Sequence, residues 1–370
     1  MIYADNAATT KLDKGALESM LPYMEECFGN PSQPYTFSKK VRKGLREARE
    51  IIAHCIGALP EEIYFTSGGT ESDNWAIKGI ARNSRGKVLT SQIEHHAVLN
   101  SCKMLECEGH KVEYLPVNSE GIVRPEVLEN NISEKCGLVS IMFANNEIGT
   151  IEPIQDLVRI SHTYGTLFHT DAVQAVGHVP IDVSTLGVDL LSASGHKFNG
   201  PKGVGFLFVR KGVEILPFMD GGTQEASMRA GTESVAAIIG MARALEDNCY
   251  KINENQQHIM KLENELLARL SSGNVDYIRN GASLHLPGNI SLSFRDYKGE
   301  MLLHRLDLMG IMISTGSACD SKNVQISHVL RAINIPREYA VGTIRISLSK
   351  ENTLDEIVCI AEAIKKIVGK

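Results

Sequence analysis

The sequence has no apolar run long enough to cross a membrane. Its apolar stretches fall short of the ~20 residues that a bilayer-spanning helix needs. The opening MIYADNAATTKLD lacks a basic segment followed by an apolar one, so no signal peptide is expected. The 38 basic and 44 acidic side chains give a net charge of −6 without a long run of one sign. This balance argues against nucleic acid or an anionic membrane as the main partner, and we expect a cytoplasmic protein.

Closely spaced cysteines are also absent. Eight cysteines are scattered over 370 residues and no C-x2-C pair occurs, which argues against a disulfide scaffold and against the common zinc motifs. We therefore expect no metal site. Most of these cysteines read as small buried apolar residues. Cys319 is the exception, because it lies between TGSA and DSKN, a context typical of a loop with an accessible thiol.

Residues 60–210 alternate short β-rich runs with helix-like stretches. The predicted strands cover 62–67, 87–92, 111–117, 137–144, 167–172, 189–194 and 204–210. Strands that alternate with helices predict an α/β fold, with a mostly parallel sheet flanked by helices. Segments 284–294 and 343–349 predict a smaller α+β unit, and the amphipathic stretch 232–272 is expected to bridge the two parts.

Polar residues follow several predicted strands at their carboxyl ends. GGTESDN follows the first strand, IEHHA the second, NNEIG the fourth, DAVQ the fifth and GHK the sixth. In open parallel sheets, ligands bind at the carboxyl ends of the strands, where such loops converge. We therefore expect these loops to form one site.

The segment TSGGTESDN places two glycines and a threonine between a predicted strand and a predicted helix. A helix N-terminus offers unpaired N–H groups and a partial positive charge, which favour a phosphate. The segment matches neither the Walker loop nor GxGxxG, so a small phosphorylated cofactor is favoured over a nucleotide. The alternative interpretation is a capping box formed by Thr70 and Asp73.

Lys197 lies in a glycine-rich turn between two predicted buried strands. A buried ammonium needs a partner or loses its proton. Asp171 ends another strand, where a carboxylate needs a cation such as a protonated ring nitrogen or an arginine, and Gln174 lies on the same side of the following turn. Together with the phosphate loop, these residues predict pyridoxal phosphate, which needs a lysine and an acid. Alternatively Lys197 is a surface lysine, and Lys202 is a rival for the cofactor lysine.

At this point the sequence resembles a known family. ADNAATT, FGNP, FTSGGTES, EHHAV, NNEIG, HTDAVQ, SGHKFNGPKGVGFL, MRAGTES, STGSAC and SHVLRA occur in this order, as in the NifS/IscS-type cysteine desulfurases of the class V aminotransferase family. The matches run from residue 4 to about residue 350. The resemblance implies pyridoxal-phosphate fold type I, with a large domain at 15–253 built on a mostly parallel seven-stranded sheet. It also implies a smaller α+β domain, formed by 1–14 and 254–370, that carries the catalytic-cysteine loop.

The resemblance also implies roles for single residues. Lys197 matches the Schiff-base lysine and general base, Cys319 the nucleophile that takes the sulfur, and His95 the imidazole that stacks on the cofactor ring. Arg345 matches the clamp on the substrate carboxylate, for which its forked geometry is suited. The implied cofactor-binding residues are Gly69, Thr70, His95, Asn146, Asp171, Gln174, Ser194, His196, Lys197 and Thr232, the last reaching the cofactor of the other subunit.

The implied reaction takes sulfur from L-cysteine, releases L-alanine and leaves a persulfide on Cys319. The sulfur then passes to an acceptor, such as an iron–sulfur scaffold protein or a tRNA-thiolating enzyme, and Cys319 could help to ligate a transferred cluster. A homodimer is implied, with no direct nucleic-acid or membrane partner. A selenocysteine lyase that does not need Cys319 and a non-catalytic iron–sulfur scaffold remain alternatives. The sequence departs from its relatives at Tyr35, where they often have histidine, and at Asp320, where a small hydroxyl residue is common.

Overall fold

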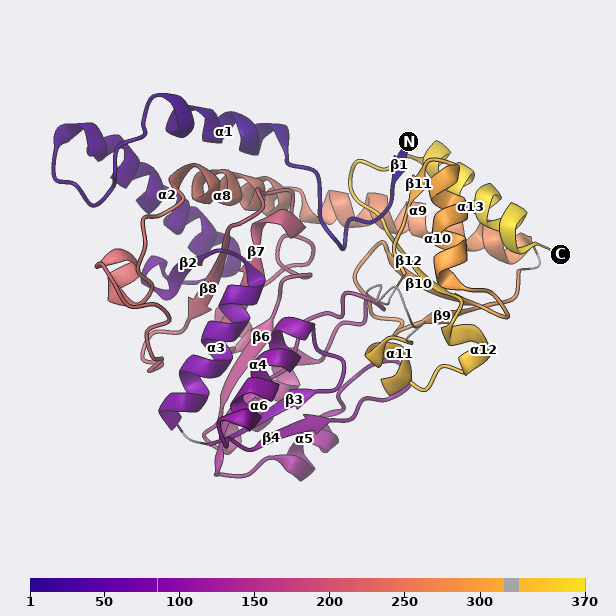
Figure 1. Cartoon of the computed structure of the whole chain (residues 1–370), viewed down its shortest axis with the longest axis horizontal. Coiled ribbons are helices and arrows are strands. Elements are labelled where there is room, and N and C mark those ends of the chain that lie inside the picture. The colour runs from indigo at the N-terminus through magenta and orange to yellow at the C-terminus, as the bar shows by residue number, and fades with distance from the viewer. Residues whose placement is uncertain (85, 274, 316–325, 370) are drawn as a thin grey trace.

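The computed structural model describes residues 1–84, 86–273, 275–315 and 326–369. Cys319 and Asp320 therefore lie outside the described residues. Two regions lie side by side, one built on a seven-stranded sheet and the other on a three-stranded sheet (Figure 1). We call them the large-sheet region and the small-sheet region. No helix in the described part of the chain is long and apolar enough to cross a membrane.

The large sheet is mostly parallel, as predicted. Its strand order is β2 (Ile63–Thr66), β8 (Gly205–Val209), β7 (Leu190–Ser194), β6 (Leu167–Asp171), β5 (Cys136–Ser140), β3 (Lys87–Ser91) and β4 (Val112–Leu115). β8 runs antiparallel to both of its neighbours, β2 and β7, and the other pairings in this sheet are parallel. The register pairs Asp171 with Ser192, and Ser140 with His169, so the ends of β5, β6 and β7 lie at one edge of the sheet.

Both faces of this sheet are covered because successive strand residues point to opposite sides. Leu138 and Leu190 pack against α3 (Gly69–Ser84) and α4 (His96–Cys107). Their neighbours Val139 and Leu191 pack in the opposite core. The helices of that opposite face are α1 (Lys14–Glu25), α2 (Lys39–Ile56), α5 (Pro125–Asn131), α6 (Ile154–Thr163), α7 (Val183–Leu186) and α8 (Val235–Tyr250).

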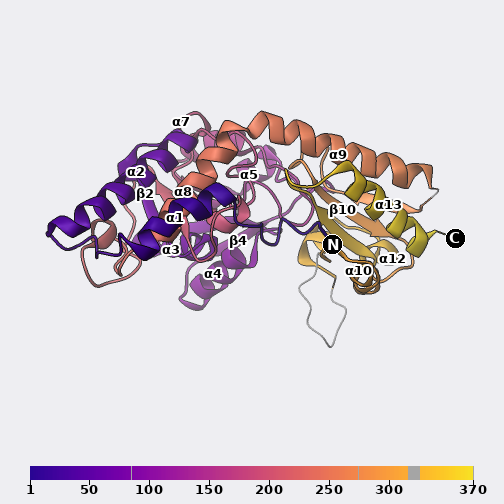
Figure 2. The same cartoon turned by 90° about the horizontal axis from the view of Figure 1, so that it is seen from above.

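The predicted bridging stretch forms two helices that meet at Lys251. The first, α8, packs on α1 and α2, and the second, α9 (Ile252–Ser272), packs on α13 (Leu354–Val368) in the small-sheet region. Figure 2 shows α9 running along the small-sheet region. The bridge is therefore confirmed, with a break that its continuous amphipathic pattern did not indicate.

The small-sheet region is the α+β unit predicted near the end of the sequence. Its antiparallel sheet has the order β12 (Thr343–Ser347), β10 (Asn289–Phe294) and β9 (Tyr277–Asn280). A parallel pair, β1 (Ile2–Tyr3) with β11 (Ile311–Met312), brings residues from both ends of the sequence together. The remaining helices are α10 (Gly299–Leu308), α11 (His328–Ala332) and α12 (Arg337–Ala340), and the 3₁₀ turns are η1 (Thr36–Ser38), η2 (Pro60–Glu62), η3 (Gly195–Lys197) and η4 (Gln224–Ser227).

Candidate active site

A cavity of about 650 Å³ lies where the carboxyl edge of the large sheet faces the small-sheet region. Ten of the predicted site residues line it: Gly69, Thr70, His95, Asn146, Asp171, Gln174, Ser194, His196, Lys197 and Arg345. Thr232 is exposed and does not line this cavity. Its predicted role concerned the other subunit and stays a prediction. Cys319 cannot be placed relative to the cavity because it falls outside the described residues.

The glycine-rich loop between β2 and α3 forms one wall of the cavity. The N–H groups in the first turn of a helix have no acceptor inside that helix, and α3 begins at Gly69 in the cavity wall. A Cβ at Gly69 would lie 2.5 Å from Cγ2 of Val173, so a side chain at this position does not fit without movement. The capping-box interpretation of Thr70 and Asp73 is wrong, because both residues lie inside α3 and Asp73 is buried.

Lys197 reaches the cavity from η3, the tight turn that joins β7 to the antiparallel β8. Its Nζ donates to the main-chain carbonyls of Ala7 and Ala8, at 2.6 and 2.9 Å. Burial, together with the positive charge of Arg345, lowers the pKa of Lys197 to about 8. Lys202 also lines the cavity but is exposed, so Lys197 is the lysine whose environment favours a neutral amine.

Asp171 ends β6 and is 5% exposed. Its Oδ1 accepts a hydrogen bond from the N–H of Val173 at 2.9 Å. Burial raises the pKa of Asp171, and the nearby His95 and Lys197 oppose this effect. The carboxylate therefore lies in a position where a cationic partner in the cavity would be stabilised.

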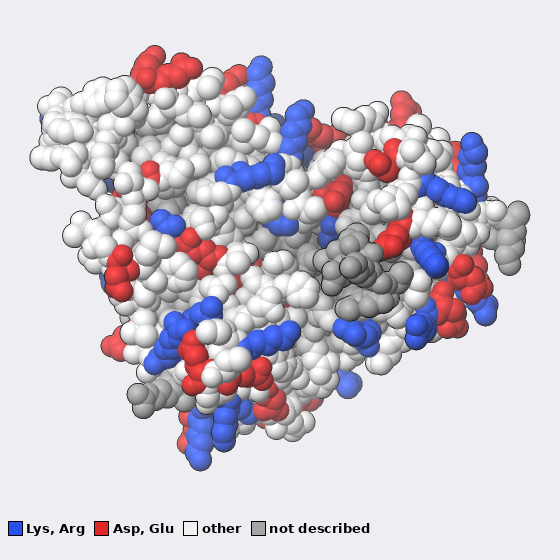
Figure 3. Space-filling view, viewed as in Figure 1, with Lys and Arg blue, Asp and Glu red and all other residues white. Residues whose placement is uncertain are grey.

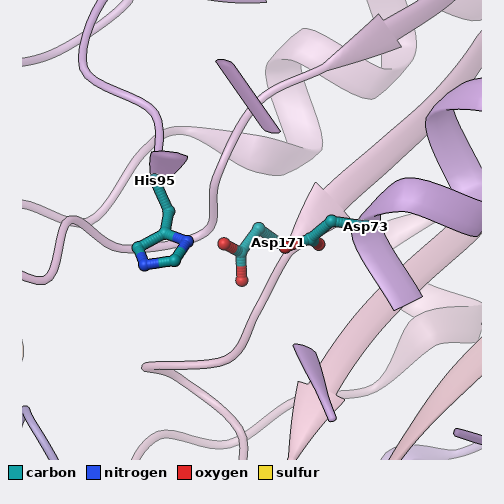
Figure 4. Close-up of side chains that lie close together, drawn as sticks. All are labelled: Asp73, His95 and Asp171. Carbon is teal, nitrogen blue, oxygen red and sulfur yellow. The ribbon is translucent and has the colours of Figure 1, made fainter. Parts of the chain in front are cut away.

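Asp73, in the GGTESDN segment that was expected at the site, was given no role beyond the capping box, yet this residue lies next to Asp171. Polar atoms of Asp73, His95 and Asp171 all lie within 4.8 Å of one another, and Figure 4 shows Asp171 between the other two. Burial and the neighbouring Asp171 raise the pKa of Asp73 well above its ordinary value. The spacing in the sequence indicates that Asp73 is buried, because it lies on the same helical face as the buried residues Ile77 and Ile80.

His95 precedes α4 and faces the cavity. Its Nδ1 accepts a hydrogen bond from the N–H of Ala97 at 3.2 Å, so in the neutral ring the proton lies on Nε2. Burial lowers the pKa of His95, against the effect of Asp171. The neighbouring His96 turns to another partner, since its ring lies 5.0 Å from that of His328.

The small-sheet region contributes Arg345, which lies on β12. Its Nη2 pairs with Asp5 at 2.7 Å and its Nη1 donates to the carbonyl of Asn146 at 3.0 Å. The Nε atom is buried and has no partner among the described residues. Asn146 therefore holds Arg345 through its main chain, a role that its predicted place near the cofactor ring did not include.

Glu147, in the NNEIG segment, is a second acidic residue for which the sequence predicted no role of its own. It lines the cavity and accepts a hydrogen bond from the hydroxyl of Ser327 at 2.5 Å. Burial raises the pKa of Glu147 to about 7, although Ser327 and Arg345 act in the opposite direction. Its carboxyl group therefore changes its charge near neutral pH.

The N-terminal segment covers the remaining predicted residues. Gln174 donates from Nε2 to the carbonyl of Ala7 at 3.0 Å, and Nδ1 of His196 lies 3.1 Å from the hydroxyl of Thr9. Burial lowers the pKa of His196 to about 4, so this ring is neutral at physiological pH. Ser194 ends β7 in the cavity wall.

These residues fit pyridoxal phosphate. A half-buried amine with a lowered pKa, a buried carboxylate and an imidazole surround one cavity. At the N-terminus of α3, Gly69 has no side chain, and an added Cβ would collide with Val173. A glycine at this position leaves the backbone N–H groups open to the cavity, as expected for a site that holds a phosphate against the backbone. The aldehyde, the ring nitrogen and the phosphate of this cofactor each need one of these groups.

Comparisons with known proteins point in one direction. A family model described as aminotransferase class-V matches residues 2–359. The cysteine desulfurase IscS of Methanosarcina thermophila is 48% identical, and the match covers all of this chain and 92% of that protein. The protein of the same name from Dictyoglomus turgidum is also 48% identical, over all of this chain and 95% of its own length. A solved structure named NifS-like protein matches with a TM-score of 0.94 at 40% identity, covering 99% of this chain and 98% of its own.

Proposed function

The chain belongs to the class-V aminotransferase family, and we propose that it is a cysteine desulfurase that works with pyridoxal phosphate. The reaction converts L-cysteine to L-alanine and transfers the sulfur to a cysteine of the enzyme. The observation that carries this proposal is the meeting of Lys197, Asp171, His95 and Arg345 at one cavity, in a chain similar over its whole length to proteins named cysteine desulfurase.

Lys197 binds the cofactor and moves the substrate proton. When bound, pyridoxal phosphate supplies an electron sink for the bonds that break at the substrate. A lysine whose pKa is about 8 has an appreciable neutral fraction near physiological pH, so Nζ can accept the Cα proton of the substrate and return it. The carbonyls of Ala7 and Ala8 orient this amine. Asp171, at the end of β6 in the cavity wall, would pair with the ring nitrogen of the bound cofactor.

Arg345 binds the carboxylate of the amino acid. The ion pair with Asp5 and the hydrogen bond to the Asn146 carbonyl hold its guanidinium in one orientation. Its buried Nε has no partner among the described residues, and this donor is suited to a carboxylate oxygen. His95 carries its proton on Nε2 when neutral, so this atom can donate a proton to, or receive one from, the substrate thiol.

Cys319 accepts the sulfur. Its thiolate attacks the substrate sulfur and forms an S–S bond while the substrate C–S bond breaks, and the electron pair of that bond stays with the carbon. A proton then replaces the sulfur on this carbon, so that L-cysteine and one enzyme thiol give L-alanine and one persulfide. Support for Cys319 comes from the STGSAC segment, since the residue lies outside the described part of the chain.

We propose a homodimer in the cytoplasm, with an iron–sulfur scaffold protein as sulfur acceptor. Phe28, Tyr35 and Phe37 are exposed by 72%, 49% and 49% in the connection between α1 and α2. In Figure 3 this end of the molecule, at the upper left, carries few charged side chains. An exposed apolar surface of this kind favours association. The seven described cysteines are all free thiols, as expected for a reducing compartment.

The decisive experiment measures alanine released from L-cysteine in the presence of a reductant. The wild type is compared with Cys319→Ala, and Cys107→Ala serves as the control because Cys107 is an exposed cysteine at the end of α4. We expect the wild type and Cys107→Ala to release alanine and Cys319→Ala to release almost none.

The other outcomes separate the alternative functions. Equal alanine release by all three proteins would show that Cys319 is dispensable, and an assay with selenocysteine would then test a lyase. A purified protein without the yellow colour of the cofactor, and without turnover, would instead favour a non-catalytic scaffold.

A further inference from the structure

Asp73 is a buried carboxyl group that the mechanism above does not use. It lies on the inner face of α3 at the floor of the cavity and is 1% exposed. Its Oδ1 has no hydrogen-bond partner among the described residues. Since Asp171 is also buried and lies within 4.8 Å, two acidic groups share one water-poor site.

Neither imidazole near Asp73 favours a positive charge. His95 lies within 4.8 Å, and burial lowers its pKa. His169 on β6 has its Nε2 3.7 Å from Oδ1. Both of its ring nitrogens lie 2.9 Å from serine hydroxyls, of Ser140 on β5 and Ser192 on β7. This ring is fully buried, and burial lowers its pKa to about 3, so it is neutral. Glu94, which follows β3, is another buried acid, and burial raises its pKa to about 8.

Asp171 lies in a different environment, although it is only a few ångströms away. It accepts the N–H of Val173 and faces His95 and Lys197. Two adjacent carboxylates cannot both stay ionised at low cost in a buried site. Of the two, Asp171 has the neighbours that stabilise a negative charge.

We propose that Asp73 is a positioning residue that stays protonated, so that the buried pair carries one negative charge and this charge remains on Asp171. A neutral Asp73 adds no like-charge repulsion beneath Asp171, which keeps that carboxylate available for the ring nitrogen of the cofactor. The inference rests on the proposed function only where it concerns the cofactor, because the proton on Asp73 can be measured in protein that does not turn over.

Infrared spectroscopy of the holoenzyme labelled with carboxyl-¹³C aspartate tests the proton directly. A protonated carboxyl group has a carbonyl band that is distinct from the carboxylate bands and shifts in heavy water. We expect the wild type at neutral pH to show such a band and Asp73→Asn to lack it. Asp156→Asn is the control, because Asp156 is an exposed aspartate on α6 that pairs with Arg159, and this variant should keep the band.

A second variant covers the case in which Asp73→Asn does not fold. Ser192→Ala leaves both carboxyl groups in place but removes a hydroxyl that hydrogen-bonds to the Asp73 carboxyl group. We expect this substitution to move the aspartic-acid band without abolishing it. A labelled wild type with no protonated aspartate band at neutral pH would overturn the proposal.

A pH titration of the cofactor's visible absorption band separates a positioning role from a structural one. A protonated Asp73 and an asparagine are both neutral, so Asp73→Asn should titrate at the same pH as the wild type. If Asp73 were an anion, the asparagine would remove a negative charge and lower the midpoint by about one pH unit, which would also contradict the proposal. If the wild type showed the protonated aspartate band but released no alanine from L-cysteine, this result would count against the proposed function and not against this inference.

Discussion

The two walls of the cavity hold their polar groups in different ways. On the large-sheet wall, the half-buried Lys197 and the buried Asp171 have pKa values that are shifted by their surroundings. On the opposite wall, Arg345 keeps its charge in an ion pair with Asp5. The first wall suits a resident group bound for many turnovers, and the second suits a carboxylate that must enter and leave. The difference shows that one cavity can hold groups with shifted pKa values on one side and a buried guanidinium with a carboxylate partner on the other.

The largest effect on activity is expected from removal of Lys197 on the large-sheet wall. We expect Lys197→Ala to lower the rate of alanine release by about 10²- to 10⁴-fold. Nζ is the proposed base, and the other lysine that lines the cavity in the described part of the chain, Lys202, is exposed. Lys211→Ala is the control, since Lys211 is an exposed lysine that pairs with Glu61. Alanine release by Lys197→Ala at the wild-type rate would contradict the assignment.

Glu147, which also lines the cavity, should make the stability of the protein depend on pH. Its pKa rises from an ordinary 4.5 to about 7 in the folded protein, so the folded state holds a proton that the unfolded state releases between these values. Glu147 therefore contributes to the free energy of unfolding at low pH. This contribution is fully present below about pH 4.5 and is lost as the pH rises through about 7, with an upper bound of about 3 kcal/mol.

Urea unfolding at about pH 5 and about pH 8 measures this effect. Glu147→Gln has no proton to lose, so its stability should fall less than that of the wild type over this interval. Glu126→Gln, at an exposed glutamate on α5, should behave like the wild type. Equal pH dependence in the wild type and Glu147→Gln would mean that Glu147 is already ionised in the folded state.

A methyl group at Gly69 tests the glycine-rich loop between β2 and α3, the proposed phosphate site. The new Cβ would lie 2.5 Å from Cγ2 of Val173, so we expect Gly69→Ala to weaken cofactor binding by about tenfold, within the 1–3 kcal/mol typical of overpacking. The double variant Gly69→Ala with Val173→Ala should bind the cofactor more tightly than Gly69→Ala alone. A fluorescence titration of cofactor-free protein gives these constants, and a double variant without recovery would mean that the collision is not the cause.

The smallest effect is expected on the small-sheet wall. Asp5→Asn keeps a side-chain oxygen opposite Arg345 but removes the charge. We expect a KM for cysteine about threefold higher and an unchanged kcat, a loss of about the net contribution of one hydrogen bond. Steady-state kinetics of alanine release measure both constants. A lower KM would show that Asp5 competes with the substrate carboxylate instead of orienting Arg345.

Local sequence patterns predicted the large sheet and the outline of the site. Apolar runs bounded by glycine and polar residues identified the strands, and the polar groups after them met at one edge, as for Asp171 after β6 and Lys197 after β7. This worked because the carboxyl ends of parallel strands share an edge, whatever the details of packing.

The missed features depend on contacts between distant segments. Asp5 and Arg345 are 340 residues apart, and no local pattern predicts their ion pair. His169 lies in a strand whose apolar neighbours indicate only burial, while its two serine partners come from other strands. The break at Lys251 between α8 and α9 follows from packing against two different cores.

The first residues of the chain have a consequence for the order in which the protein folds. Their contacts are among the most distant in sequence, because Asn6 bonds to Ser347, 341 residues away, and β1 pairs with β11. During synthesis this segment leaves the ribosome well before its partners on β11 and β12, and it meets them only after residues up to Ser347 have been translated. The contacts of Ala7 and Ala8 with Lys197 need only the residues up to the large sheet, whereas the ion pair of Asp5 with Arg345 has to wait for β12. A nascent chain can therefore have the large sheet and its lysine well before Arg345 is in place.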